Sequence, residues 1–169
     1  MQDCDTSKPI RRFRIAISIL IAGLLLSGIT AFPLLSDVRA LTEIVGLGEA
    51  TSTAGYDGLA HWLLTVRFGL EKVYADYPWI AYGTDWLAFA HLVVAAFFVG
   101  PLMAPWHSRH TILAGIAACI GVIPLALICG AIREVPLLSR LIDCSFGVGG
   151  LILLLYCRRL LPEIEAAAP

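Results

Sequence analysis

The residues of this 169-residue chain that could do chemistry are ionisable side chains inside long apolar stretches. An ionisable group at the centre of a membrane span costs at least about 2.5–3.5 kcal/mol, so each such group needs a partner or a function. Carboxylates, guanidiniums, an imidazole and a thiol at one depth could pair, or could line a polar site. The candidate site residues are Asp85, His91, Arg133, Arg140, Asp143 and Cys144.

A hairpin centred between residues 136 and 137 would bring several of these side chains to one depth. Residues equidistant from that centre share a level, so Arg133 is expected level with Arg140, and Cys129 with Cys144. In one interpretation, ion pairs such as Arg140–Asp143 clamp the helix ends together. In the other, the same residues line a pocket that opens to the exterior and binds a small polar or anionic ligand. The sequence leaves both open.

His91 is expected to donate a hydrogen bond to a neighbouring helix, and with Asp85 it could also relay protons. A haem would need a second axial ligand at the same depth, and no other histidine lies inside an apolar stretch. The cofactor content is therefore left open. His107 and His110 have a spacing that could hold a metal, but in a short basic and aromatic link we expect them to contact lipid headgroups. No metal site is predicted.

Cys129 and Cys144 are a possible thiol pair. A disulfide would require that their Cβ atoms face each other near an oxidising compartment. Free cysteine also packs well in an apolar core. The cysteines show no CxxC spacing, so no zinc or thioredoxin-like motif is present.

The elements that position these residues are four apolar stretches. The chain is 59% hydrophobic and only 15% charged, with a mean hydropathy of +0.83, so lipid must cover part of its surface. About 20 apolar residues cross roughly 30 Å of hydrocarbon. We predict an all-α membrane protein, a single domain with spans at about 15–35, 80–102, 111–132 and 141–161. Short links predict an antiparallel four-helix bundle, and the first stretch is too long for a signal peptide.

Residues 36–78 form the one substantial segment between spans. Apolar side chains at helical spacing predict an amphipathic helix from about Asp57 to Tyr77, with Arg67, Glu71 and Lys72 off its apolar stripe. A shorter helix is expected at about 37–45. The longer helix could lie flat in the membrane interface or cap the bundle, and we favour the cap.

Positive residues next to span ends predict that both termini are cytoplasmic and that residues 36–78 are extracytoplasmic. The clustered residues are Lys8, Arg11, Arg12, Arg14, Arg109, Arg158 and Arg159. The net charge of −1 argues against nucleic acid as a partner. The expected partners are the lipid bilayer, a small polar ligand from the extracytoplasmic side, and an oligomer mate or partner subunit.

Three runs, at residues 28–34, 82–91 and 140–147, resemble a group of small bacterial four-span membrane proteins. The likeness covers most of the chain beyond its first dozen residues. It implies the bacterial cytoplasmic (inner) membrane, but it supplies no activity, cofactor or catalytic residue.

Three functions follow as hypotheses. The favoured one is a non-enzymatic subunit that binds a small solute, senses it or assists a partner through a polar pocket at the outer end of the bundle. The first alternative is a membrane redox or hydrolytic enzyme that uses Asp85, His91, Asp143 and Cys144. The second is a small proton-coupled transporter that acts as an oligomer.

Overall fold

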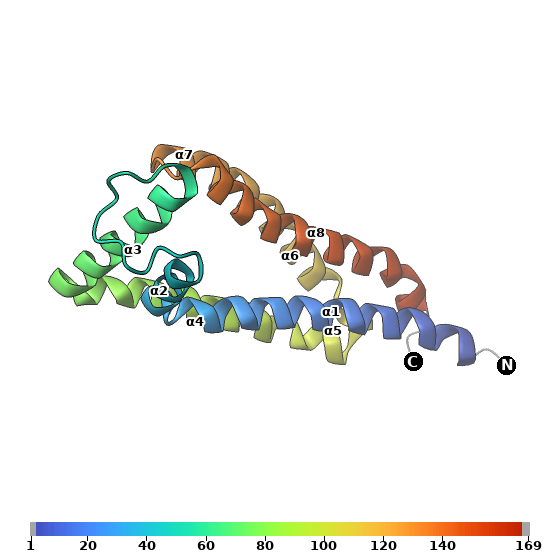
Figure 1. Cartoon of the computed structure of the whole chain (residues 1–169). Coiled ribbons are helices and arrows are strands. Elements are labelled where there is room, and N and C mark those ends of the chain that lie inside the picture. The colour runs from blue at the N-terminus through green and yellow to red at the C-terminus, as the bar shows by residue number, and fades with distance from the viewer. Residues whose placement is uncertain (1–2, 167–169) are drawn as a thin grey trace. The chain divides into compact units, whose positions relative to one another are not determined.

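The computed structural model describes the backbone of residues 3–166 and the side chains of residues 8–166. Regular structure in this part of the chain is entirely helical (Figure 1). The chain divides into two compact units. Unit 1 contains the residues up to Leu24 together with those from Val93 onward, and unit 2 contains Leu25–Leu92.

Four helical segments are long and apolar enough to cross a membrane, as predicted. They are Lys8–Ala31, Pro78–Met103, Arg109–Ile132 and Leu137–Ala166. The first belongs to helix α1 (Asp3–Ala31), which ends before the predicted residue 35. Pro33 explains the early end, because a proline disfavours helical backbone in the residue before it. The last segment is helix α8 (Leu137–Ala166), which begins directly after Pro136.

Prolines also divide the second and third spans. A short 3₁₀ turn, η1 (Pro78–Ile80), leads into α4 (Ala81–Phe97), and α5 (Val99–Met103) follows. The helix breaks there because Pro101 has no N–H to donate to the Phe97 carbonyl.

The third span follows a second 3₁₀ turn, η2 (Pro105–His107), and begins with α6 (Arg109–Pro124). At Pro124 it gives way to a π-helical turn, η3 (Leu125–Cys129), and then to α7 (Gly130–Ile132).

The core of unit 1 combines residues from the start of α1, from the α4–α5 junction, from α6 and from the second half of α8. Its buried members are Phe13, Ala16, Ile17, Phe98, Ile112, Ile116, Leu154, Cys157, Leu161 and Ile164. Between helices in lipid, such a core stabilises through close packing rather than through removal of apolar surface from water.

Small residues bring α6 and α8 close together. A Cβ on Gly147 would lie 3.0 Å from the Cys119 carbonyl oxygen, and one on Gly115 would lie 2.8 Å from the Leu154 side chain. Neither approach would be possible with a larger residue. The two helices therefore pack closely, with backbone against backbone at Gly147.

The turn between α7 and α8 differs from the predicted hairpin. Gly130 lies against the Arg140 side chain, which centres the hairpin at about residue 135 rather than between residues 136 and 137. Glu134 adopts a positive φ of 57°, and the Val135 amide donates to the Gly130 carbonyl at 2.9 Å. The tighter turn changes which residues share a depth.

Unit 2 contains α2 (Leu34–Ile44) and α3 (Gly58–Asp76), together with the end of α1 and most of α4. Both extra helices confirm the predicted ones within a few residues. Within this unit, α1 and α4 touch at Gly28, where a Cβ would lie 3.0 Å from the Ala88 carbonyl oxygen.

Candidate functional site

An open, shallow cavity of about 250 Å³ lies beside Asp85 on the surface of unit 2. It is lined by Phe32, which directly follows α1, and by four residues in the first turns of α4: Tyr82, Asp85, Trp86 and Phe89. The spacing of the four α4 residues follows from the helix, since positions three and four apart lie on one face. Asp85 is the one charged residue in this lining, beside four aromatic residues.

The aromatic rings of this cavity hold one another in place. Tyr82 and Trp86 meet edge to face with centroids 6.0 Å apart, and Trp86 and Phe89 do so at 6.1 Å. Such pairs are favourable because the positive edge of one ring meets the negative face of the other. Half-buried Asp85 has no hydrogen-bond or ion-pair partner among the residues that the structure describes. The lining of this cavity thus combines one acidic residue that has no partner in the described chain with four aromatic residues.

His91 does not join this cavity. Its Nδ1 donates to the Leu87 carbonyl of its own helix at 2.8 Å, and not to a neighbouring helix as predicted. Asp85 and His91 lie six residues apart on α4, which places them about 120° apart around the axis of a helix with 3.6 residues per turn.

The other predicted site residues, Arg133, Arg140, Asp143 and Cys144, belong to unit 1, so neither unit alone holds the full set. Arg140 donates from Nη1 to the Leu127 carbonyl at 3.3 Å, and its Nε is buried without a partner. Asp143 is exposed, and Arg140 and Asp143 form no ion pair in the described part of the chain. The convergence of all six residues stays a prediction.

Cys129 and Cys144 are free thiols. The Cys144 thiol points to the Ile123 carbonyl at 3.9 Å, while Cys129 is exposed. The hairpin turns earlier than the sequence suggested, so Cys144 lies nearer the level of Ile123 than that of Cys129. The thiol pair stays a prediction. Between residues 8 and 166, no cluster of three His, Cys, Asp or Glu side chains could hold a metal.

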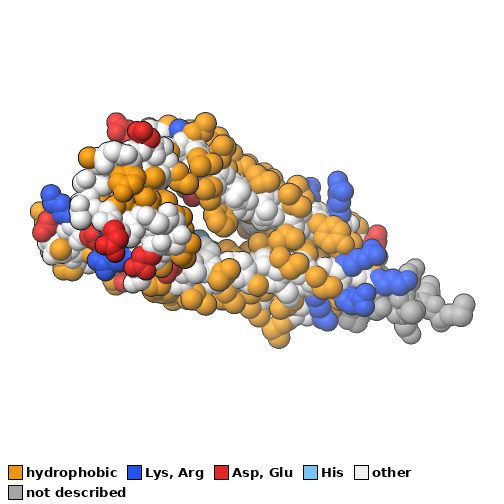
Figure 2. Space-filling view, viewed as in Figure 1, with side chains coloured by type: hydrophobic (Ala, Val, Ile, Leu, Met, Phe, Trp, Pro, Cys, Tyr) orange, Lys and Arg blue, Asp and Glu red, His pale blue; other side chains and the backbone are white. Residues whose placement is uncertain are grey.

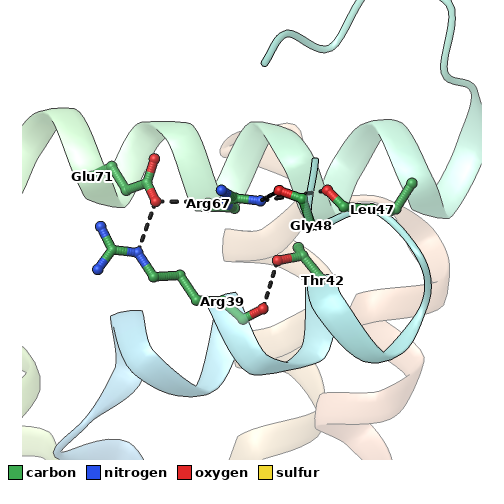
Figure 3. A network of polar contacts seen from close by, with 6 residues as sticks. All are labelled: Arg39, Thr42, Leu47, Gly48, Arg67 and Glu71. Carbon is green, nitrogen blue, oxygen red and sulfur yellow. Dashed lines mark hydrogen bonds and ion pairs between the residues drawn. The ribbon is translucent and has the colours of Figure 1, made fainter. Parts of the chain in front are cut away.

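A polar network that the sequence did not reveal joins α2 to α3 (Figure 3). Glu71 on α3 accepts hydrogen bonds from Arg39 Nε at 2.8 Å and from Arg67 Nε at 3.3 Å. Arg67 Nη1 also donates to the carbonyls of Gly48, at 3.0 Å, and Leu47, at 3.4 Å. One arginine thus binds both its own helix and the segment that leads to it.

Arg67 and Glu71 were expected off the apolar stripe of α3, and the structure turns them toward α2. The Arg67 side chain is only 17% exposed. In the sequence, the one signal of this network was the i, i+4 spacing of Arg67 and Glu71, and such pairs are common on exposed helix faces. The hydrogen bond from Arg39, reinforced by Arg67, lowers the pKa of Glu71 below its ordinary value of 4.5, although burial opposes the shift. Glu71 is therefore charged over a wide pH range.

Sequence and structure comparisons match this chain to no protein family, no curated protein and no solved structure. The resemblance to small bacterial four-span proteins stays a prediction.

Proposed function

We propose that this chain is a non-enzymatic membrane protein that binds a small solute with a cationic group beside Asp85, as a sensor or an accessory subunit. The observation that carries this proposal is the unpartnered Asp85 carboxylate in an aromatic-lined cavity of about 250 Å³. Aromatic faces attract cations, most strongly where water is partly excluded. A carboxylate adds the full opposite charge that selects a cation over a neutral solute.

The proposed setting is the bacterial cytoplasmic membrane, with the four spans as an antiparallel bundle and both termini cytoplasmic. The cluster of basic residues at the start of α1, the start of α6 and the end of α8 supports this orientation. It makes α2 and α3 an extracytoplasmic amphipathic cap. Asp85 then lies about 10 Å below the outer end of its span, at 1.5 Å per residue from Pro78. A solute from outside could reach it.

Binding without catalysis is favoured over the enzyme hypothesis by the arrangement of α4. An acid–base pair needs its two groups within reach of the same reacting atom. Asp85 and His91 face different sides of the helix, and His91 uses Nδ1 on its own backbone. The same geometry argues against a direct proton relay between these two residues.

The test is a titration of the purified protein with tetramethylammonium, followed by tryptophan fluorescence, since Trp86 lines the cavity. The matched neutral probe is 3,3-dimethylbutanol. We expect saturable quenching by the cation, weakened roughly tenfold in Asp85→Asn. Asp76→Asn, which removes an exposed carboxylate at the end of α3, is the control and should bind like the parent. Equal affinity for the neutral probe, or unchanged binding in Asp85→Asn, would overturn the proposal.

A further inference from the structure

A second cavity, in unit 1, has the opposite charge. It measures about 150 Å³ and lies between the first turn of α6, which supplies Arg109 and Leu113, and the last turns of α8, which supply Arg158, Leu161 and Pro162. Pockets for complete organic ligands usually measure about 300–1,000 Å³. This one is smaller, and suits a single anionic group.

The two arginines of this cavity are not equivalent. Arg109 is held by Glu165, which accepts from Arg109 Nε at 3.0 Å and from Nη2 at 2.6 Å. In the part of the chain that the structure describes, Arg158 has no hydrogen-bond or ion-pair partner. Two guanidiniums and one carboxylate leave a net charge of +1 at the cavity. A singly charged anion would neutralise this net charge.

The surroundings of the cavity indicate where this anion comes from. Lys and Arg side chains gather at the end of unit 1 where α1 begins and α8 ends (Figure 2). The ends of membrane-spanning helices lie at the level of lipid headgroups. Leu113, Leu161 and Pro162 add apolar surface beside the charges. A phospholipid offers the matching pair of groups, a phosphodiester and the start of an acyl chain.

We propose that Arg109 and Arg158 bind the phosphodiester of an anionic phospholipid, with Leu113, Leu161 and Pro162 in contact with its glycerol and upper acyl chains. Arg158 supplies the positive charge that no carboxylate balances. Arg109 supplies a second guanidinium, which it shares with Glu165. Guanidiniums suit phosphate because their planar N–H groups can form two parallel hydrogen bonds. Glu165 fixes Arg109 against α8 and so keeps the two walls of the cavity together. This site is independent of the proposed solute site at Asp85.

The test measures binding of phosphatidylglycerol to the detergent-purified chain by native mass spectrometry, with phosphatidylcholine as the zwitterionic comparison. We expect phosphatidylglycerol to bind preferentially, and Arg158→Gln to bind it about tenfold more weakly. Arg159→Gln is the matched control, because it removes the same charge from the adjacent residue, which does not line the cavity. It should bind like the parent.

A second variant, Leu113→Trp, fills the cavity while it keeps every charge, and it should also weaken binding. The proposal is overturned if Arg158→Gln and Arg159→Gln lose affinity equally, because that result indicates a diffuse positive surface. It is also overturned if phosphatidylcholine binds as well as phosphatidylglycerol, or if Leu113→Trp binds normally. Competition by free glycerol 3-phosphate at the same concentration would assign the site to a soluble phosphate and reject the lipid. Tetramethylammonium binding should be unchanged in Arg158→Gln, which separates the two sites.

Discussion

Gly130 lies directly beneath the Arg140 side chain, and this contact fixes the turn between the third and fourth spans. A Cβ on Gly130 would lie 2.6 Å from Arg140 Cδ and 2.7 Å from Cγ. The stem of Arg140 would then have to move, together with the guanidinium that donates to Leu127. Glycine is thus required here by the space that its neighbour occupies.

Gly130→Ala should therefore destabilise the protein by about 1–3 kcal/mol, the usual cost of an added methyl group in a packed site. Thermal unfolding in detergent measures the change. Gly121→Ala is the control, since nothing lies within 4 Å of its added Cβ, and alanine favours helix over glycine. It should be neutral or stabilising. Equal losses in the two variants would contradict the packing argument.

The charge on Glu71 predicts a pH dependence. Its pKa is lowered in the folded protein, mainly by the hydrogen bond from Arg39. A group with a depressed folded pKa contributes stability above its unfolded value, and this contribution is lost as the pH falls through the folded value. The contacts between α2 and α3 should therefore weaken as the pH falls below about 4.5, the ordinary value. Hydrogen exchange of the α3 amides measures the loss. In Glu71→Gln, the acid-dependent part of this change should disappear.

Asp85 was recognised from the sequence as a candidate binding residue because a carboxylate in an apolar span is costly. Phe32, Tyr82 and Phe89 approach Asp85 through helix geometry and a contact between α1 and α4, which a single sequence does not specify. The predicted equal depth of Cys129 and Cys144 depends in the same way on the position of a turn, which a single sequence does not specify.

At the scale of helices, Arg67 has a larger role than its exposed i, i+4 pairing suggests. It donates to Glu71 and also to the carbonyls of Leu47 and Gly48, whereas Arg39 donates to Glu71 from a side chain that is 51% exposed. Exposed ion pairs contribute about 0–1 kcal/mol. The carbonyls of Leu47 and Gly48 are part-buried, and a buried carbonyl left without a donor costs up to about 1–3 kcal/mol.

Arg67→Gln should thus raise hydrogen exchange across residues 45–57 and α3 by roughly tenfold, and Arg39→Gln by less. Lys72→Gln is the matched control, because Lys72 is exposed and adjacent to Glu71 but makes no hydrogen bond to it. Exchange measured by mass spectrometry resolves the segments. If the Arg39 variant had the larger effect, the carbonyl contacts of Arg67 would not be important.

The existence of each helix could be predicted from apolar length and periodicity, and α3 was placed within one residue at each end. Boundaries were missed where local chemistry decides them. Pro33 ends α1 early, and Pro101 separates α4 from α5. The α7–α8 turn depends on a positive φ at Glu134, a residue without a strong turn signal.

For the whole molecule, the proposed orientation makes a direct prediction. Ser52→Cys, in the segment between α2 and α3, should react with a membrane-impermeant maleimide in intact bacterial cells. His107→Cys, in the link before α6, should react only after the membrane is opened. Both residues are exposed, and the parent chain reports the background from its own cysteines. Reversed labelling would place the Asp85 cavity on the cytoplasmic side and would reject an external solute.

The π-helical turn after Pro124 has a consequence for how this chain tolerates changes in length. In η3 the backbone hydrogen bonds join residues five apart instead of four. The turn therefore contains one residue more than an α-helix that covers the same distance. Removing a single residue from Leu125–Cys129 would convert the turn to ordinary helix and leave the third span long enough to cross the bilayer. The same deletion within α6 would rotate the side chains on one side of the deleted residue by about 100° relative to those on the other side, and so away from α8. The extra residue makes this turn the one place in the span where a deletion can be absorbed.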